Sequence, residues 1–412
     1  MAPAPPRRMW RAAPNFRAHP PTFGAPRRSR DAPPGRLPGR AARPARAALA
    51  LALVVVALAG CAGRLRAPQP PALADRLGEL FLVGFHGTAA GDNAALERLL
   101  CEARVGGLVL FARNVVDPAQ VAALTGAVRE RARACAGRPP LIAVDAEGGA
   151  VMRLGPRAGW TPTMSAEELG RANDVALTEL EARRIGRMLR EAGVDWNFAP
   201  VVDVGYNPAN PVIVGHGRAF AADPRRVTAH ARAFVRGMRA AGVLTALKHF
   251  PGHGSSLADS HVGFVDVTET AVPDIELAPY RALIAEGLAD SVMTAHVVNR
   301  WIDPFYPATL SARAIDGLLR GALGFAGPVV SDDLRMNAIE GRYGMAEAAL
   351  LALEAGVDAL LIADDRLPDG TSATARVLPA LRRALDDGRL PADRVAEALD
   401  RVGALRARLA AR

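Results

Sequence analysis

The chain has 412 residues, of which 50% are hydrophobic, and this composition excludes both a small disulfide scaffold and a wholly disordered protein. Its formal net charge is +9, but residues 1–70 hold 13 Arg and one acidic residue, a net of +12. Residues 71–412 therefore carry 38 basic and 41 acidic residues, a net of −3. The positive charge belongs to an N-terminal tail, so the body has no charge excess that favours nucleic-acid binding.

The N-terminal residues predict an export signal. A Pro- and Arg-rich leader, residues 1–46, precedes an apolar run of 14 residues at 47–60. That run is too short to span a bilayer core of about 30 Å, which needs about 20 residues, and is typical of a signal-peptide core. It continues into Cys61 as LAGC, which resembles the lipobox of bacterial lipoproteins, where the Cys thiol is lipidated. The resemblance implies a lipid anchor on Cys61, facing the periplasm or the exterior. Secretion after plain signal cleavage and a non-cleaved anchor are the alternatives.

We accordingly divide the chain into three parts. Residues 1–60 are the basic leader and signal peptide, residues 61–74 are a linker, and residues 75–412 form the folded body. The other two cysteines are Cys101 and Cys135, and whether they pair cannot be inferred from the sequence. Neither has the CxxC spacing of a metal site.

Eight short apolar runs alternate with longer helical patterns from about residue 80 onward. The helical patterns include residues 118–135, 173–192 and 224–241. Strands alternating with helices predict a parallel sheet, and eight such units favour a single (β/α)8 TIM-type barrel over an open doubly wound sheet. No GxGxxG or GxxxxGK[ST] motif follows the first run, which argues against a nucleotide-binding fold. The runs are residues 80–85, 107–111, 141–145, 195–203, 244–249, 291–296, 328–332 and 359–364.

Polar and ionisable residues gather at the carboxyl ends of these runs. In a barrel these ends surround one mouth, where the active sites of this fold lie. Lys248 stands out among them because the chain has 50 Arg and a single Lys, which indicates a position that needs a compact ammonium group. The residues at the ends are Asp145, Glu147, Asp203, Lys248, His249, His296, Asp332 and Asp333.

The segment KHFPGHGSSLADSH, residues 248–261, concentrates three His and an Asp. Its Gly, Pro and Ser residues predict a loop, so His249 and His253 are not a zinc pair on one helical face. Asp259 and His261 predict an acid/base dyad, because a carboxylate beside an imidazole orients the ring and raises its proton affinity. A metal site with His249, His253 and His261 as ligands is the alternative.

An acid/base dyad alone does not hydrolyse a glycosidic bond. The reaction also needs a carboxylate on the side of the anomeric carbon opposite the leaving group. Asp332 is our candidate because it ends an apolar strand and should be rigidly held at the mouth. We expect Asp333 to face elsewhere and to cap the next helix, since successive strand side chains alternate. Asp145 can accept hydrogen bonds from two sugar hydroxyls, and Arg153 and Arg218 can donate to the substrate.

These motifs resemble glycoside hydrolase family 3, and most closely its single-domain bacterial β-N-acetylglucosaminidases. The resemblance rests on DAEGG at residues 145–149, on the loop at 248–261 and on SDDL at 331–334, together with Arg153 and Arg218. It implies a retaining mechanism in which Asp332 attacks the sugar, while His261, assisted by Asp259, is the acid/base. It also implies that no metal or organic cofactor takes part. The residues implied to contact the terminal N-acetylglucosamine are Asp145, Arg153, Arg218, Lys248 and His249.

Two positions depart from the family pattern. Ala146 stands where relatives often have Gln, and GRAF at residues 217–220 replaces a more usual Arg-Ser-Phe. Neither departure removes a residue assigned to chemistry, so we expect any effect to fall on substrate affinity or choice.

We therefore predict a monomeric, retaining exo-β-N-acetylhexosaminidase that releases terminal β-linked N-acetylglucosamine from peptidoglycan fragments or chitooligosaccharides. Three alternatives stay open. They are a metal-dependent hydrolase on the same barrel, a non-catalytic saccharide-binding lipoprotein, and phosphorolysis in place of hydrolysis. The last is considered because a His donor repels phosphate less than a carboxylate would.

Overall fold

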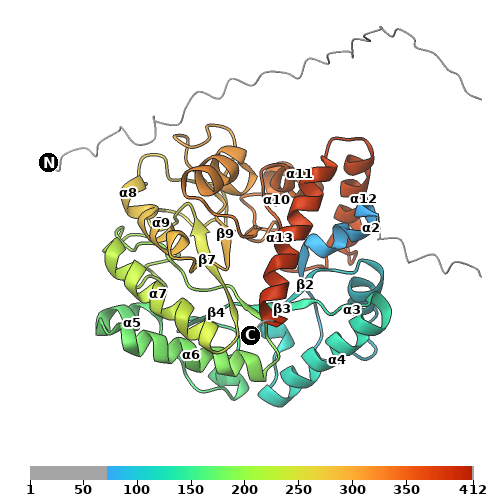
Figure 1. Ribbon diagram of the computed structural model, residues 1–412, viewed down its shortest axis with the longest axis horizontal. Coiled ribbons are helices and arrows are strands. Elements are labelled where there is room, and N and C mark those ends of the chain that lie inside the picture. The colour runs from blue at the N-terminus through green and yellow to red at the C-terminus, as the bar shows by residue number, and fades with distance from the viewer. Residues whose placement is uncertain (1–71, 411–412) are drawn as a thin grey trace, which may run out of the picture. The chain divides into compact units, whose positions relative to one another are not determined.

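The computed structural model describes residues 72–410, in which eight parallel strands surround a central core and helices cover them (Figure 1). The predicted leader, signal peptide and Cys61 lie outside the described residues, as does most of the predicted linker. The barrel strands are β1 (Phe81–Gly84), β2 (Gly107–Leu110), β3 (Leu141–Val144), β6 (Trp196–Asn197), β7 (Leu244–Phe250), β9 (Ser291–Thr294), β11 (Val329–Val330) and β12 (Leu360–Ile362).

The eight strands follow one another around the barrel as β11-β9-β7-β6-β3-β2-β1-β12, and each pair is parallel. Its two ends meet because Val330 forms a parallel bridge with Ala359, and the Ser331 N–H donates to the Ala359 carbonyl at 2.9 Å. Each of the eight predicted runs contains one strand, so the predicted (β/α)8 barrel is confirmed.

Strand β6 is much shorter than the predicted run at 195–203. Pro200 has no N–H to donate to a ladder. The Asn197 side chain also takes over backbone pairing, since it accepts from the Ala146 N–H at 3.0 Å and donates to the Ala146 carbonyl at 2.8 Å. The run therefore leaves the regular strand after Asn197, although Val201 still forms a parallel bridge with Lys248 of β7.

The long outer helices begin and end as the sequence predicts. Helix α4 (Pro118–Ala136) starts after Asp117, whose side chain accepts from the Gln120 N–H, and ends at Gly137, which adopts a left-handed φ of 75°. Between residues 72 and 410, none of the helices combines the length and the apolar character needed to cross a bilayer. The other main helices are α2 (Leu73–Arg76), α3 (Ala94–Glu97), η4 (Arg98–Glu102), α5 (Ala166–Ala172), α6 (Val175–Glu191), α7 (Pro224–Ala240), α8 (Pro273–Glu276), α9 (Ala278–Ala285), η8 (Arg313–Ala322), α10 (Glu340–Tyr343), α11 (Met345–Glu354), α12 (Ala373–Asp386) and α13 (Ala392–Ala410).

The barrel interior is packed by apolar side chains, and α13 lies across its amino end (Figure 1). Val402 and Leu405 of α13 belong to the same buried cluster as the inward-facing Trp196 and Phe198. The interior is therefore closed at this end, so the site must lie at the opposite, carboxyl end of the strands.

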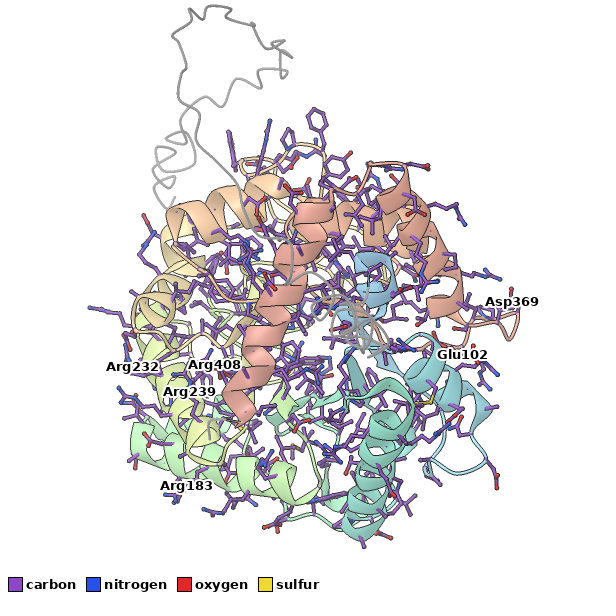
Figure 2. The ribbon with its side chains drawn as sticks, turned by 45° about the vertical axis from the view of Figure 1, so that its right-hand side comes forward. Glu102, Arg183, Arg232, Arg239, Asp369 and Arg408 are labelled. Carbon is purple, nitrogen blue, oxygen red and sulfur yellow. A yellow bond between two sulfur atoms is a disulfide. The ribbon has the colours of Figure 1, made fainter. Side chains whose placement is uncertain are left out.

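Arginines from the surrounding helices bind buried aspartates that directly precede barrel strands. Asp290, one residue before β9, accepts from Arg239 of α7 at 2.8 Å and from Arg408 of α13 at 2.7 Å. The two arginines lie close together on the outer face, as Figure 2 shows. Asp195, one residue before β6, accepts from Arg129 of α4 at 2.8 Å. These pairs connect the helical layer to the strands.

Cys101 and Cys135 form a disulfide, a pairing that the sequence did not predict. The bond joins η4 to the last turn of α4, and the two Cα atoms are 5.3 Å apart. It therefore links two neighbouring elements of the outer layer.

Candidate active site

The carboxyl ends of β3, β7 and β11 bring most of the predicted site residues to one mouth. Asp145 directly follows β3, Lys248 lies within β7, and Asp332 follows β11 by two residues. A short hairpin of β4 (Ala146–Gly148) and β5 (Val151–Met152) follows Asp145, and Arg153 lies directly after it. The strands thus fix the backbone positions from which these side chains project.

Lys248 lies between two carboxylates. Its Nζ is 2.8 Å from Asp145 Oδ1 and 2.7 Å from Glu147 Oε1, and the residue is only 2% exposed. Burial alone would lower the pKa of Lys248, but Asp145 and Glu147 outweigh it and raise that pKa. A planar guanidinium would not match these two contacts as well as a compact ammonium group, which agrees with the choice of Lys at this one position.

Glu147 also binds Arg218 through two hydrogen bonds. Arg218 Nε donates to Oε2 at 2.9 Å and Nη2 donates to Oε1 at 2.7 Å. Burial would raise the pKa of Glu147, but the charges of Arg218 and Lys248 keep it well below its ordinary range. Glu147 therefore stays ionised and orients both cations.

His249 is held by Asp203, a buried carboxylate at the end of the fourth predicted run. His249 Nδ1 lies 2.7 Å from Asp203 Oδ2, and Arg218 Nη2 lies 3.3 Å from His249 Nε2. This pattern assigns the proton to Nδ1, with Nε2 as the acceptor. Burial would raise the pKa of Asp203, but the nearby His249 lowers it.

Arg153 is less tightly held than Arg218. Its Nη2 is 3.7 Å from Asp145 Oδ2, and its guanidinium carbon lies 6.0 Å from the centre of the Phe111 ring. Its buried Nε has no hydrogen-bond partner among the described residues. The guanidinium is therefore free to donate to a ligand near Asp145.

Asp332 is half-buried at the mouth, and its Oδ1 accepts from the Asp333 N–H at 2.8 Å. Burial would raise the pKa of Asp332, but His296, His249, the Asp333 N–H and His261 together lower it. Asp332 is thus an ionised carboxylate among imidazoles, the state that a nucleophile requires.

Asp333 does not share the environment of Asp332, as the strand pattern predicts. Its Oδ1 accepts from the Ala363 N–H at 2.9 Å and from the Arg335 N–H at 3.1 Å. Burial raises the pKa of Asp333 to about 6. Asp333 thus connects β11 to the residue after β12 and closes a turn; it does not cap the next helix as we expected, because α10 begins only at Glu340. Its carbonyl accepts from His296 Nε2 at 2.9 Å.

Asp259 and His261 form the predicted pair on the loop. Asp259 Oδ1 lies 2.7 Å from His261 Nδ1 and accepts from the His261 N–H at 2.8 Å. The His261 side chain is 63% exposed. Because Asp259 occupies Nδ1, Nε2 is the ring atom that can exchange a proton with a substrate.

The three loop histidines do not converge on one point, as a metal site would require. His249 faces Asp203, His253 Nε2 lies 3.2 Å from Ser260 Oγ, and His261 faces Asp259. No group of three or more His, Cys, Asp or Glu side chains in residues 72–410 is arranged to hold a metal ion. The donor geometry therefore does not favour the metal-dependent alternative.

Three residues of this mouth had no assigned role in the sequence analysis: Glu147, Asp203 and His296. Each was recognised as a polar residue at a strand end, and that position was the available signal. Glu147 pairs with Arg218 from 71 residues away along the chain, Asp203 with His249 from 46 and His296 with Asp333 from 37, and only the folded barrel reveals these pairs.

A parallel barrel whose mouth holds an ionised carboxylate, an Asp–His pair and a network of hydroxyl-binding charges has the parts of a glycosidase. The chain belongs to glycosyl hydrolase family 3: the model described as "Glycosyl hydrolase family 3 N terminal domain" matches residues 72–405. The family resemblance predicted from the motifs is confirmed.

Individual relatives agree with this assignment. A β-hexosaminidase of Xylella fastidiosa (strain M23) is 42% identical over 306 residues, which cover 72% of this chain and 87% of the relative. A solved family 3 β-N-acetylglucosaminidase from Paenibacillus sp. is 39% identical with a TM-score of 0.77; the match covers 83% of this chain and 63% of that one. A β-N-acetylhexosaminidase from Beutenbergia cavernae is 35% identical with a TM-score of 0.72, covering 81% of this chain and 98% of that one.

Proposed function

We propose that the protein is a retaining exo-β-N-acetylhexosaminidase that hydrolyses terminal β-linked N-acetylglucosamine. The observation that carries the proposal is the carboxylate of Asp332, which the structure holds at the barrel mouth two residues after β11. Relatives named β-hexosaminidase and solved structures titled β-N-acetylglucosaminidase support the choice of sugar. The alternative of a non-catalytic binding protein is disfavoured because the candidate nucleophile, Asp332, and the candidate acid/base, His261 with Asp259, are both present.

The reaction proceeds in two steps. Asp332 attacks the anomeric carbon and forms an ester with it, while the glycosidic C–O bond breaks and His261 Nε2 gives its proton to the departing oxygen. In the second step His261 takes a proton from water, which attacks the anomeric carbon and releases Asp332. Two inversions give net retention, and Asp259 stabilises the imidazolium form of His261.

The terminal sugar is held on the β3–β7 side of the mouth. Asp145, fixed by Lys248, accepts hydrogen bonds from hydroxyls, while Arg153, Arg218 and His249 supply the remaining polar contacts. Because Lys248 and Glu147 fix these groups before the sugar arrives, little ordering is left for the binding step.

The proposal extends to the location of the enzyme. We infer a lipoprotein, anchored through Cys61 in the cell envelope, that acts on peptidoglycan fragments or chitooligosaccharides as a monomer. The disulfide between Cys101 and Cys135 supports an exported protein, because disulfides persist in oxidising compartments. Recovery of the wild type in the membrane fraction, and of Cys61→Ala outside it, tests the anchor; equal distribution of the two would contradict it.

A chromogenic β-N-acetylglucosaminide tests the activity. Asp332→Ala should reduce turnover by at least ten-thousandfold because the nucleophile is lost. His261→Ala should impair substrates with poor leaving groups far more than those with acidic ones, since only poor leaving groups need a proton. Asp387→Ala, which changes an exposed carboxylate at the end of α12, is the matched control and should behave as wild type.

The same assay separates the alternatives. Proton NMR of the first product should show the β-anomer. Product release should be unchanged by EDTA and by inorganic phosphate. Full activity of Asp332→Ala would refute the proposed function, whereas phosphate-dependent formation of a sugar phosphate would identify phosphorolysis.

A further inference from the structure

The loop that carries the dyad has two parts with different environments. We call residues 251–256 the anchored half and residues 257–264 the carrier half. Every residue of the anchored half is buried. In the carrier half Leu257, Val262 and Phe264 are exposed, whereas Ser260 is only 2% exposed.

Side chains from outside the loop hold the backbone of the anchored half. Asn210 Nδ2 donates to the His253 carbonyl at 2.7 Å, and Asn207 Nδ2 donates to the Ser255 carbonyl at 3.0 Å. The His253 N–H donates to Asp203 Oδ1 at 2.8 Å. The anchored half is therefore a fixed part of the barrel mouth.

A single hydrogen bond joins the carrier half to the anchored half. Ser260 Oγ lies 3.2 Å from His253 Nε2, and no other hydrogen bond links the two halves within the described part of the chain. The other hydrogen bonds of the carrier half are internal to it, such as those of His261 to Asp259. The position of the carrier half thus depends on Ser260 and, at its far end, on the Arg342 guanidinium, whose carbon lies 5.7 Å from the centre of the Phe264 ring.

His253 is suited to this task. It is 2% exposed, and its Nδ1 has no hydrogen-bond partner among the described residues, so Nε2 is the one ring nitrogen that is engaged. Burial lowers the pKa of His253, which keeps the ring neutral. A neutral, immobile imidazole gives the Ser260 hydroxyl a fixed partner.

The bond fixes the backbone that carries the dyad. Ser260 lies between Asp259 and His261 in the chain, so fixing it restricts both neighbours. Asp259 Oδ1 in turn holds His261 through the ring Nδ1 at 2.7 Å and the backbone N–H at 2.8 Å. The position of the imidazole therefore depends on the position of this short segment.

We propose that Ser260 is a positioning residue for the acid/base: its hydrogen bond to the buried His253 holds His261 within reach of the bond to be cleaved. This inference rests on the proposed function. Ser260 touches neither substrate nor reacting atoms, and it acts only through His261.

The test compares two serines of the same loop. Ser260→Ala removes the hydroxyl that binds His253. Ser256→Ala is the matched control, because Ser256 is fully buried but its hydroxyl has no hydrogen-bond partner among the described residues. Both variants and the wild type are assayed for kcat/KM on N,N′-diacetylchitobiose, which has a poor leaving group, and on the 2,4-dinitrophenyl N-acetylglucosaminide, which has a good one.

Ser260→Ala should lower kcat/KM at least tenfold on the disaccharide and less than twofold on the dinitrophenyl substrate, because only the first needs proton donation. Ser256→Ala should stay within twofold of wild type on both. A uniform loss on both substrates, an equal loss in Ser256→Ala, or no loss in Ser260→Ala would each overturn the proposal. Failure of the wild type to hydrolyse either substrate would instead refute the proposed function.

Discussion

Glu276 is a buried acid at the end of α8 that forms a hydrogen bond with the anchored half of the dyad loop, residues 251–256. Its Oε1 accepts from the Tyr206 hydroxyl at 2.9 Å and from the Ser255 N–H at 3.2 Å. No ion pair of Glu276 is found among the described side chains, and Asp203 lies close enough to repel a second negative charge. Burial, and then Asp203, raise the pKa of Glu276 to about 8. The folded protein therefore holds a neutral carboxylic acid here at neutral pH.

This raised pKa predicts how stability depends on pH. The unfolded chain releases the Glu276 proton near its ordinary pKa of 4.5, whereas the folded protein retains it up to about 8. The contribution of Glu276 to the free energy of unfolding is therefore largest below pH 4.5, falls as the pH rises to about 8, and is constant above that. At about 1.4 kcal/mol per pKa unit, the fall amounts to about 5 kcal/mol.

Glu276→Gln replaces the titrating carboxyl group with an amide that does not titrate. The variant should therefore gain stability relative to wild type as the pH rises from 5 to 8. Urea unfolding of both proteins at pH 5, 7 and 9 measures the difference. Glu130→Gln, which changes an exposed acid on α4, should show no such trend. A difference between Glu276→Gln and wild type that stays constant with pH would contradict the assignment of a neutral Glu276.

At the scale of elements, the alternation of apolar runs and helical patterns was enough to predict all eight barrel strands. Helical spacing also predicted the long helices, and at the start of α7 the structure adds a local cap, because the Asp223 side chain accepts from the Arg225 N–H. The shortness of β6 was predictable only in part: Pro200 is visible in the sequence, but the pairing of Asn197 with the backbone of Ala146 comes from another strand end. Such contacts become visible only when the sheet order is known.

In the candidate site, too, features set by the local sequence were predicted and features set by long-range contacts were not. Short-range patterns identified Asp259 with His261, two residues apart, and placed Asp332 at the end of a strand. Long-range partners were missed: Glu147 holds Arg218 from 71 residues away. The sequence indicates candidate groups for contact with a ligand, whereas the groups that orient these candidates depend on which loops the barrel brings together.

The connection between the strands and the outer helices can be tested at Asp358, two residues before β12. This fully buried carboxylate accepts from Arg320 and Arg394 at 2.6 Å each and from the Val329 N–H at 2.8 Å. Asp358→Ala would deprive two largely buried guanidinium groups of their nearest counter-ion, leaving only the more exposed Asp316 and Glu397, each 3.6 Å away. We expect a loss of about 3–5 kcal/mol in the free energy of unfolding. Asp387→Ala is the exposed control, and a loss in Asp358→Ala no larger than in this control would contradict the structural role.

At the scale of the whole molecule, the covalent structure supports the proposed export. The body is nearly balanced in charge, and the basic excess of the chain lies in residues 1–70. The disulfide between Cys101 and Cys135 spans 34 residues and joins η4 to α4, two elements that flank β2. A covalent link of this kind restricts the unfolded chain more than the folded one, so it should add stability only where the compartment keeps it oxidised.

Loop-closure entropy predicts that this disulfide contributes about 3–4 kcal/mol to the free energy of unfolding, given its span of 34 residues. The double variant Cys101→Ser/Cys135→Ser should therefore unfold at lower urea concentration than the oxidised wild type. Dithiothreitol should lower the stability of the wild type to near that of the double variant and leave the variant unchanged. Activity should persist in both states below the unfolding transition, because neither cysteine lies at the mouth. An identical unfolding midpoint with and without reductant would show that the bond does not stabilise the barrel.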